Sequence, residues 1–189
     1  MKKVLLLLAE GFEEVEALTT VDYLRRVDII VDICSIMGEK TVEGAHRIVV
    51  TSDKVLDEIK NIKNYDGLVI PGGMPGATNL RKNDRVIELV KEFNRGEKLI
   101  AAICAGPIVL QRAGILKERE VTSYPGFDND LKEGIYKEDL VVQDGNIITA
   151  RGPAVAVYFA LKLVENLVGE EKAEELKKDI LLDMVEKFI

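Results

Sequence analysis

The chain has 189 residues, which is enough for one domain of ordinary size and too few for two large ones. Hydrophobic residues make up 47% and charged residues 31%, a balance that is typical of a globular protein and excludes a disordered one. Acidic residues number 33 against 26 lysines and arginines, giving a net charge of −7, and the basic residues are scattered. We therefore expect no nucleic-acid partner.

Cysteine and histidine are scarce. Cys34 and Cys104 alone cannot build a disulfide framework, and with His46 as the only histidine there is no His/Cys cluster for a metal. We therefore expect no metal and no cofactor. Reduced thiols fit a cytoplasmic location best.

The N-terminal apolar run covers residues 4–9 only. It is shorter than the roughly 7 to 15 residues of a signal-peptide core and the roughly 18 of a membrane span. An acidic segment follows it, without a small-residue cleavage site. We expect a buried first strand and no membrane association.

Apolar runs and helical periodicities then alternate along the chain. After the first strand, we expect a helix over 13–26, a strand over 29–36, one or two short extended pieces within 41–51 and a helical turn over 52–59 opened by a Ser/Asp cap. The middle of the chain should form a strand over 67–70, a helix over 83–93, a strand over 98–103 and a helix over 107–114. The last part should form a short strand over 120–123, a hairpin over 140–150 with a QDGN turn, a helix over 155–169 and an amphipathic helix over 170–189.

Uniformly apolar strands that alternate with helices predict a doubly wound α/β fold, with a mostly parallel sheet covered by helices on both faces. No repeat or linker interrupts the chain, so we expect one domain over residues 1–189. In the flavodoxin-like strand order 2-1-3-4-5, the loops AEGFEEVE, PGGMPG and CAGP follow neighbouring strands. They should meet in one crevice at the carboxyl ends of the strands.

Cys104 lies between an apolar strand and a helix, with small neighbours at Ala102, Ala105 and Gly106. Small residues allow the tight strand-to-helix turn that exposes a nucleophile, and the following helix N-terminus lowers the pKa of a thiol. The alternative is a small core cysteine. Cys34 lies in the middle of a strand, and we assign it to core packing.

The acidic residues Glu10, Glu13, Glu14 and Glu16 open the first helix, where the helix dipole favours carboxylates. A glutamate that instead points into the crevice would have a raised pKa and could donate a hydrogen bond to a thiolate. PGGMPGA is either a simple turn or a source of backbone N–H groups for an oxyanion. It is neither a Walker loop nor a dinucleotide fingerprint, so nucleotide binding has little support. His46 is by default a surface loop residue.

Five motifs occur in order along nearly the whole chain: AEGFEEVEA, LVIPGGMPGATNL, IAAICAGP, VTSYPG and ITARGPA. Together they resemble the ThiJ/PfpI superfamily, most closely its DJ-1-like branch. The resemblance implies a flavodoxin-like fold of the class I glutamine amidotransferase type and a homodimer or higher homo-oligomer.

The resemblance also implies site residues. Cys104 would be the reactive, oxidation-prone nucleophile, Glu16 would hydrogen-bond its sulfur, and the N–H groups of Gly73 and Ala105 would form an oxyanion hole. Further residues that would line the site or lie near the dimer interface are Gly72, Tyr124, His46, Arg151 and Arg26.

Two departures from the family pattern concern histidine. The protease-like branch has a histidine directly after the cysteine, where this chain has Ala105, and this argues against a Cys-His peptidase. The DJ-1-like branch usually has a histidine where this chain has Tyr124, whose hydroxyl can still donate a hydrogen bond. His46 could partly replace the missing group near the site across the dimer.

The leading hypothesis is a cysteine enzyme of the glyoxalase or deglycase type that converts small reactive carbonyls such as methylglyoxal to lactate. The first alternative is a redox-sensing or chaperone-like stress protein in which Cys104 is oxidised. The second is an intracellular cysteine peptidase.

Overall fold

The computed structural model describes residues 1–188, whose central sheet has seven strands in the order β10-β11-β7-β6-β1-β2-β5. Neighbouring strands are parallel except in the β10–β11 hairpin. The order β2-β1-β6-β7-β11 is the flavodoxin-like order, so the predicted fold is confirmed. The strands are β1 (Lys3–Leu8), β2 (Ile30–Ser35), β5 (Lys54–Val55), β6 (Gly67–Ile70), β7 (Leu99–Ile103), β10 (Val141–Asp144) and β11 (Ile147–Ala150).

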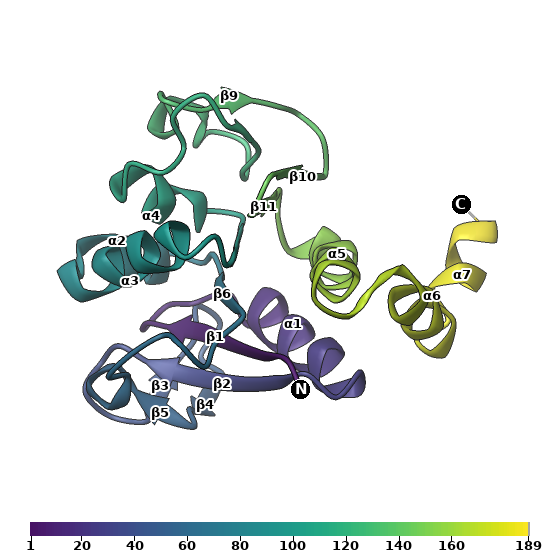
Figure 1. Ribbon diagram of the computed structural model, residues 1–189, viewed down its shortest axis with the longest axis horizontal. Coiled ribbons are helices and arrows are strands. Elements are labelled where there is room, and N and C mark those ends of the chain that lie inside the picture. The colour runs from purple at the N-terminus through teal and green to yellow at the C-terminus, as the bar shows by residue number, and fades with distance from the viewer. Residues whose placement is uncertain (189) are drawn as a thin grey trace.

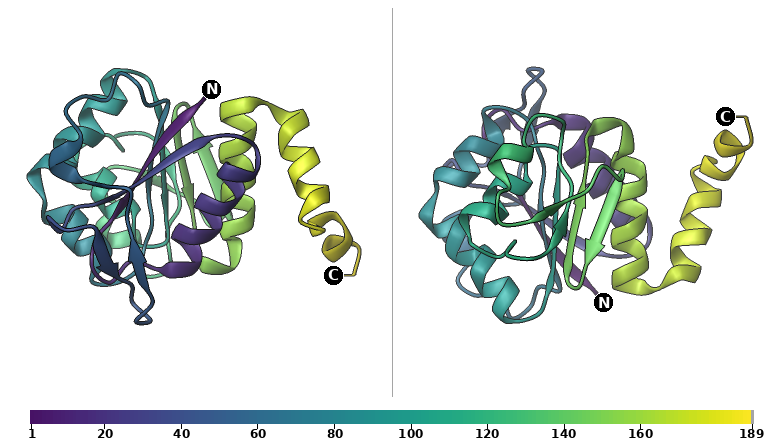
Figure 2. Two further views of the ribbon diagram at one scale, coloured as in Figure 1. Left: turned by 90° about the horizontal axis from the view of Figure 1, so that it is seen from below. Right: turned by 90° about the horizontal axis from the view of Figure 1, so that it is seen from above.

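Helices cover both faces of this sheet (Figures 1 and 2). One face carries α2 (Gly76–Lys82), α3 (Asp84–Arg95) and α4 (Pro107–Arg112), and the other carries α1 (Glu14–Arg26) and α5 (Ala156–Val168). Successive side chains of a strand point to opposite faces, so an all-apolar strand supplies both layers of core. Along β1, Leu5 and Leu7 join one buried cluster and Leu6 and Leu8 the other.

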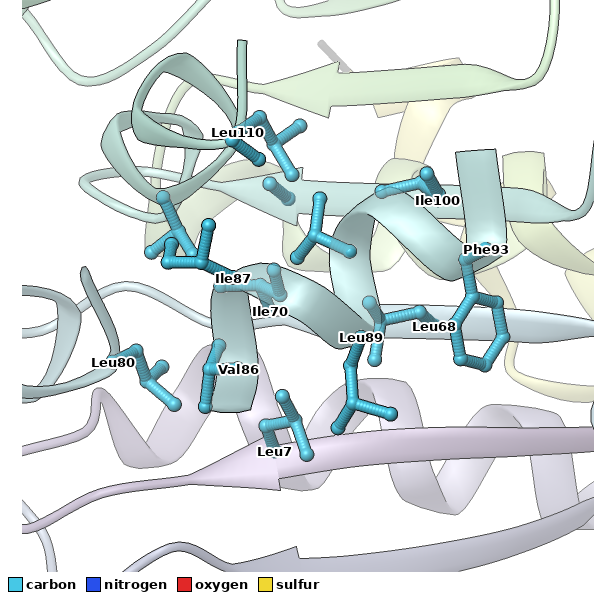
Figure 3. Packing of buried hydrophobic residues seen from close by; sticks show 14 of the residues in the cluster. Leu7, Leu68, Ile70, Leu80, Val86, Ile87, Leu89, Phe93, Ile100 and Leu110 are labelled. Atoms are coloured by element: carbon cyan, nitrogen blue, oxygen red, sulfur yellow. The ribbon is translucent and has the colours of Figure 1, made fainter. Parts of the chain in front are cut away.

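Figure 3 shows the cluster beneath α2, α3 and α4. Leu7, Leu68 and Ile70 of the sheet face Phe93 of α3 and Leu110 of α4, and all five side chains are buried. Full burial of such a side chain contributes about 1.5 to 3 kcal/mol. This core fixes the strand ends from which the site loops emerge.

The segment after β2 differs in part from its expected structure. β3 (Thr41–Glu43) and β4 (Val49–Thr51) form the short extended pieces as an antiparallel pair. The expected Ser/Asp cap at 52–59 was wrong, because the Ser52 hydroxyl donates to the carbonyls of Lys40 and Lys54. The chain instead forms β5 and then the 3-10 turn η1 (Leu56–Glu58).

The sequence did not predict α2, because the motif PGGMPG was interpreted as a loop and the next helix was expected only over 83–93. The loop ends at the cis Met74–Pro75 bond, and the helix begins at Gly76. The strand expected over 120–123 is limited to β8 (Glu120–Val121), which pairs with β9 (Ile135–Tyr136) outside the central sheet. Two further 3-10 turns are η2 (Asp128–Asp130) and η3 (Pro153–Val155).

The C-terminal segment is not the single helix expected over 170–189. It divides into α6 (Glu170–Asp179), α7 (Leu182–Val185) and η4 (Glu186–Phe188), because Leu181 adopts the left-handed conformation at φ 62°. α6 buries Ala173 and Leu176 and lies outside α5, away from the sheet (Figure 2). Ile189 lies outside the described residues. None of the helices in residues 1–188 has the length and apolar character needed to cross a bilayer.

Candidate active site

The three loops singled out by composition meet at one end of the sheet, as expected. They follow β1, β6 and β7, which are neighbours in the sheet. A cavity of about 440 Å³ opens between them and the loops that precede β4 and follow β8 and β11. Cavities of this size suit small organic ligands. Its lining residues are Glu13, His46, Gly73, Met74, Cys104, Ala105, Tyr124, Phe127 and Pro153.

Cys104 occupies a strained turn between β7 and α4, at φ 61°. The left-handed conformation costs a residue with a side chain about 1 to 2 kcal/mol. Two hydrogen bonds hold the turn: the Cys104 N–H donates to the carbonyl of Ala150 at 2.9 Å, and its carbonyl accepts from the Tyr124 N–H at 3.0 Å. A side chain at Gly106 would come within 2.6 Å of the carbonyl of Ile70, so this position requires glycine. The expected elbow is present, with its partly buried thiol in the cavity lining.

Glu16 reaches the same point from α1 and is fully buried. Its Oε2 accepts a hydrogen bond from the Gly72 N–H at 2.8 Å, while Oε1 has no hydrogen-bond partner among residues 1–188. Burial raises the pKa of Glu16 to about 7, although the Gly72 N–H and the Cys104 thiol oppose the shift. The carboxyl group therefore changes protonation near neutral pH.

The Cys104 thiol and the Glu16 carboxyl group are coupled. Burial, followed by the charge of Glu16, raises the pKa of Cys104 to about 12, and the backbone N–H groups of Gly73 and Ala105 oppose this rise. The part of the Cys104 pKa shift that comes from the negative charge of Glu16 disappears when Glu16 is protonated. A thiolate at Cys104 is therefore compatible with a neutral Glu16, which can donate a hydrogen bond to the sulfur.

The glycine pair of the PGGMPG loop is required by close contacts. A side chain at Gly72 would lie 2.6 Å from the Cβ of Cys104. Gly73 has φ 87°, and a Cβ there would lie 2.3 Å from the Glu13 nitrogen. These approaches bring the N–H groups of Gly73 and Ala105 to the sulfur, the arrangement expected of oxyanion donors.

His46 lines the cavity of its own chain, so reaching it does not require the approach across a dimer that the sequence suggested. Its Nδ1 lies 2.9 Å from Oε2 of Glu14 and 3.7 Å from Oε1 of Glu13. Hydrogen bonding to Glu14, with a further contribution from the Glu13 charge, raises the pKa of His46. In residues 1–188 these three side chains form the one group of potential metal ligands within 4.8 Å of one another, but Glu14 and His46 already bond each other.

The other expected site residues are divided between the cavity and more distant positions. Tyr124 lines the cavity, with its ring against Gly152. Arg151 donates to the carbonyl of Glu138 at 2.8 Å and is absent from the lining. Arg26 pairs with Asp22 at the far end of α1, so the structure does not bring it to the cavity.

The sequence analysis missed Met74, Phe127 and Pro153 as lining residues. Met74 and Pro153 lie within motifs that were quoted, PGGMPG and ITARGPA, so closer attention to those loops would have found them. Phe127 follows VTSYPG and carries no signal of its own. It reaches the cavity because the loop after β8 folds back over Cys104, where the Tyr124 N–H bonds the Cys104 carbonyl.

The fold and site together define an α/β protein with a cysteine on a strand-to-helix elbow beside a buried glutamate. A model of the DJ-1/PfpI family matches residues 2–166, and the chain belongs to this family. The helices after residue 168 thus lie beyond the matched segment.

Relatives and solved structures agree with this assignment. The chain is 38% identical over 184 residues to the Parkinson disease protein 7 homolog of Danio rerio, covering 96% of this chain and 97% of that protein. It is 39% identical over 182 residues to the glutathione-independent glyoxalase DJR-1.2 of Caenorhabditis elegans, covering 94% and 95%. The crystal structure of DJ-1beta from Drosophila melanogaster superposes with a TM-score of 0.91 at 37% identity, covering 95% and 97% of the two chains.

Proposed function

We propose that this protein is a cysteine-dependent enzyme that converts small reactive carbonyls, methylglyoxal in particular, to hydroxy acids such as lactate. The observation that carries the proposal is the Cys104 elbow: a thiol in an open cavity, beside a buried carboxyl group and two backbone N–H donors. A nucleophile, a proton donor and an oxyanion site are the parts that addition to an aldehyde requires. No cofactor is needed.

In the first step, the Cys104 thiolate adds to the aldehyde carbon. A C–S bond forms, the π electron pair moves to oxygen, and the N–H groups of Gly73 and Ala105 stabilise this oxyanion. Protonation gives a hemithioacetal. Neutral Glu16 donates a hydrogen bond to the sulfur before attack, and its ionised form can accept a proton afterwards.

The next steps are an isomerisation and a hydrolysis. A proton leaves the former aldehyde carbon and one is added to the ketone carbon through an enediol, while the hydroxyl proton moves to the former ketone oxygen. The product is a lactoyl thioester. Water then attacks the thioester carbon, the C–S bond breaks, and lactate, the thiolate and two protons are released, one of which replaces the proton taken up in the first step. The aldehyde carbon is oxidised and the ketone carbon is reduced, so no external oxidant enters.

The name of the Caenorhabditis elegans relative, a glutathione-independent glyoxalase, supports this choice of substrate class. The lining supports it as well, because Tyr124, Phe127 and Pro153 offer mainly apolar surface and the backbone donors supply the polar contacts. Such a cavity suits a compact, uncharged carbonyl compound. We do not propose a peptidase, since Ala105 occupies the position of the peptidase histidine.

The test is lactate formation from methylglyoxal by the wild-type protein and by Cys104→Ser. We expect multiple turnovers from the wild type and a loss of at least about 1,000-fold in the variant, because the nucleophile is removed. Cys34→Ser is the matched control, since this buried thiol lies outside the cavity lining. Equal lactate formation by Cys104→Ser would contradict the proposal.

A second candidate function is redox sensing, in which Cys104 is oxidised to a sulfinic acid held by Glu16 and the backbone N–H groups. A solved relative described as oxidised Toxoplasma gondii DJ-1 favours it, at 35% identity and a TM-score of 0.90. A sensor would consume peroxide stoichiometrically and leave methylglyoxal unchanged. Mass spectrometry of Cys104 after peroxide, together with the lactate assay, separates the two functions.

We also propose that the protein is a homodimer or a higher homo-oligomer. Three large apolar side chains are more than half exposed: Val15 on α1, Ile48 just before β4 and Val49 in β4. Ile48 lies beside α1, because its N–H donates to Glu14 at 3.4 Å. Sedimentation or light scattering at micromolar concentration measures the mass, and a monomer would contradict this proposal.

A further inference from the structure

The loop that carries His46 is attached to α1 by a buried carboxylate. Oε1 of Glu14 accepts the His46 N–H at 2.7 Å and the Ile48 N–H at 3.4 Å, and Oε2 pairs with the His46 ring at 2.9 Å. The Glu14 side chain is only 4% exposed. Burying a carboxylate is favourable only where it is paired, and here His46 and Ile48 of a single loop supply hydrogen bonds to both of its oxygens.

The loop is shaped to fit this carboxylate. A Cβ at Gly44 would lie 2.3 Å from Oε1 of Glu14, so the chain passes the carboxylate too closely for a side chain. Burial would raise the pKa of Glu14, but the hydrogen bonds from His46 outweigh it and hold that pKa below its ordinary value. Glu14 is therefore charged at neutral pH, and it orients an imidazole that lines the same cavity as Cys104.

We propose that His46, oriented by Glu14, carries the proton for the substrate oxygen in the Cys104 reaction, an inference that rests on the function proposed above. Glu16 is fully buried beside the sulfur, and one of its oxygens is bonded to Gly72. Glu16 is therefore placed to exchange a proton with the Cys104 thiol. His46 is 67% exposed at the cavity and can exchange protons with water.

The charged and titratable groups around His46 favour its protonated form. Glu13 and Glu14 face it from α1, and the hydrogen bond to Glu14 followed by the Glu13 charge raises the pKa of His46. The same cavity is lined by Cys104, with Glu16 behind it, and by Tyr124. Arg47 is the next residue in the chain and has an exposed side chain. The imidazolium is thus populated at the pH at which Glu16 changes protonation.

The proton transfer balances over one turnover. As the thiolate adds to the aldehyde, the imidazolium gives its proton to the new alkoxide, leaving a neutral imidazole and a hemithioacetal hydroxyl. During hydrolysis of the thioester, the neutral imidazole accepts a proton from the attacking water while the C–S bond breaks and the thiolate leaves, and the lactic acid formed releases its remaining proton to solvent. His46 returns to the imidazolium form, and Glu14 acts only as a positioning residue.

The first test is the pH profile of kcat/KM for methylglyoxal in the wild type, His46→Gln, Glu14→Gln and the control Arg47→Gln. General acid catalysis contributes about 100-fold or more, so we expect kcat/KM of His46→Gln to fall by about 10- to 100-fold for this exposed group. The alkaline decline that follows the loss of the His46 proton should disappear. In Glu14→Gln that decline should move to lower pH.

Alkylation of Cys104 by iodoacetamide should proceed at the wild-type rate in His46→Gln, because the thiolate does not depend on the imidazole. Arg47→Gln should keep the wild-type pH profile. An unchanged alkaline limb in His46→Gln, or a kcat/KM within about twofold of the wild type, would overturn the proposal, because general acids contribute far more than this.

Failure of the proposed function can be distinguished from failure of this inference. If the wild type forms no lactate, the proposed function is wrong, and the inference is then decided by the addition step alone. The rate of this addition is measured as the rate at which methylglyoxal protects Cys104 from alkylation by iodoacetamide. Slower protection in His46→Gln supports the role of His46, whereas an equal rate, or no protection in the wild type, overturns it.

A second measurement needs no substrate. His46 is the only histidine, so its imidazole signals in a proton NMR titration are unambiguous. We expect a pKa above the ordinary value near 6.5 in the wild type and a lower one in Glu14→Gln. Equal values in the two proteins would overturn the positioning role of Glu14.

Discussion

The backbone N–H of Gly72 donates a 2.8 Å hydrogen bond to Oε2 of Glu16, a residue 56 positions earlier in the chain. This bond joins the glycine loop after β6 to the first helix and fixes the carboxyl group beside Cys104. It also supplies a donor to a carboxylate that has lost all contact with water. Burial of this charge outweighs the hydrogen bonds from Gly72 and Cys104, which is why the pKa of Glu16 rises to about 7.

Glu16→Gln should change the dependence of stability on pH. The folded-state pKa of Glu16 is raised from 4.5 to about 7, so the folded protein binds more protons than the unfolded chain in this window. Stability of the wild type is therefore lost as the pH rises towards 7, by up to about 3 kcal/mol, and Gln carries no such penalty. We expect the free energy of unfolding of Glu16→Gln, measured with urea, to increase relative to that of the wild type as the pH rises from 4.5 to about 7. Parallel stability curves would contradict the shifted pKa.

Gly72→Ala should disrupt the site. Its Cβ would lie 2.6 Å from the Cβ of Cys104 and 2.8 Å from Oε2 of Glu16, so both side chains must move. Overpacking of this kind costs about 1 to 3 kcal/mol, and we also expect slower alkylation of Cys104. Gly96→Ala is the matched control at the end of α3, because the atom nearest to its Cβ, the Glu92 carbonyl oxygen, would lie at 3.4 Å. Equal effects of the two changes on Tm and on alkylation would refute the argument.

The two cysteines should differ sharply in reactivity. Cys34 is fully buried in β2, and burial together with the Asp32 charge raises its pKa to about 12. The pKa of Cys104 is raised to the same value, but this thiol lines an open cavity, so access to the reagent distinguishes the two cysteines. Native protein should therefore take up one equivalent of iodoacetamide, at Cys104, while the denatured chain takes up two. If peptide mapping found labelled Cys34 in the native protein, the prediction would be wrong.

Leu181→Asn should stabilise the protein slightly. Leu181 is 57% exposed and sits at φ 62°, a conformation that Asn tolerates better than Leu. Because little apolar burial is lost, we expect a gain of about 0.5 kcal/mol, seen as a higher Tm. Val185→Asn is the control, since Val185 is equally exposed but lies in α7. A fall in Tm for Leu181→Asn would contradict the prediction, because it would mean that packing of the Leu181 side chain stabilises the fold.

The predicted fold was confirmed because its signal is spread along the chain: strands such as 4–9 and 99–103 are uniformly apolar and alternate with amphipathic helices. The helix after Pro75 was missed because its start depends on a glycine loop packed against Gly11, where a Cβ at Gly76 would lie 2.8 Å from the Gly11 carbonyl oxygen. The break at Leu181 has no sequence signal, since neither Gly nor Pro occurs there.

The site was predictable only in part, for a related reason. The elbow at Cys104 has a local signature of small residues, and the resemblance to a family pointed to Glu16. Glu14 had an adequate local explanation as a first-turn carboxylate, and the sequence gives no indication that residues 44–48 fold over it. Contacts between distant segments, such as His46 with Glu14, are set by tertiary packing, which periodicity does not encode.

The Cys104 turn is held by Ala150 on one side and by Tyr124 on the other, and both of these residues follow it in the chain. A polypeptide emerging from the ribosome therefore exposes this cysteine before either hydrogen bond can form. Until β11 joins the sheet, the Cys104 N–H has no Ala150 carbonyl to bond, and the turn lacks one of its two hydrogen bonds. The elbow is thus completed only when these later segments have folded against it, so the part of the chain that ends at Cys104 cannot form the site by itself.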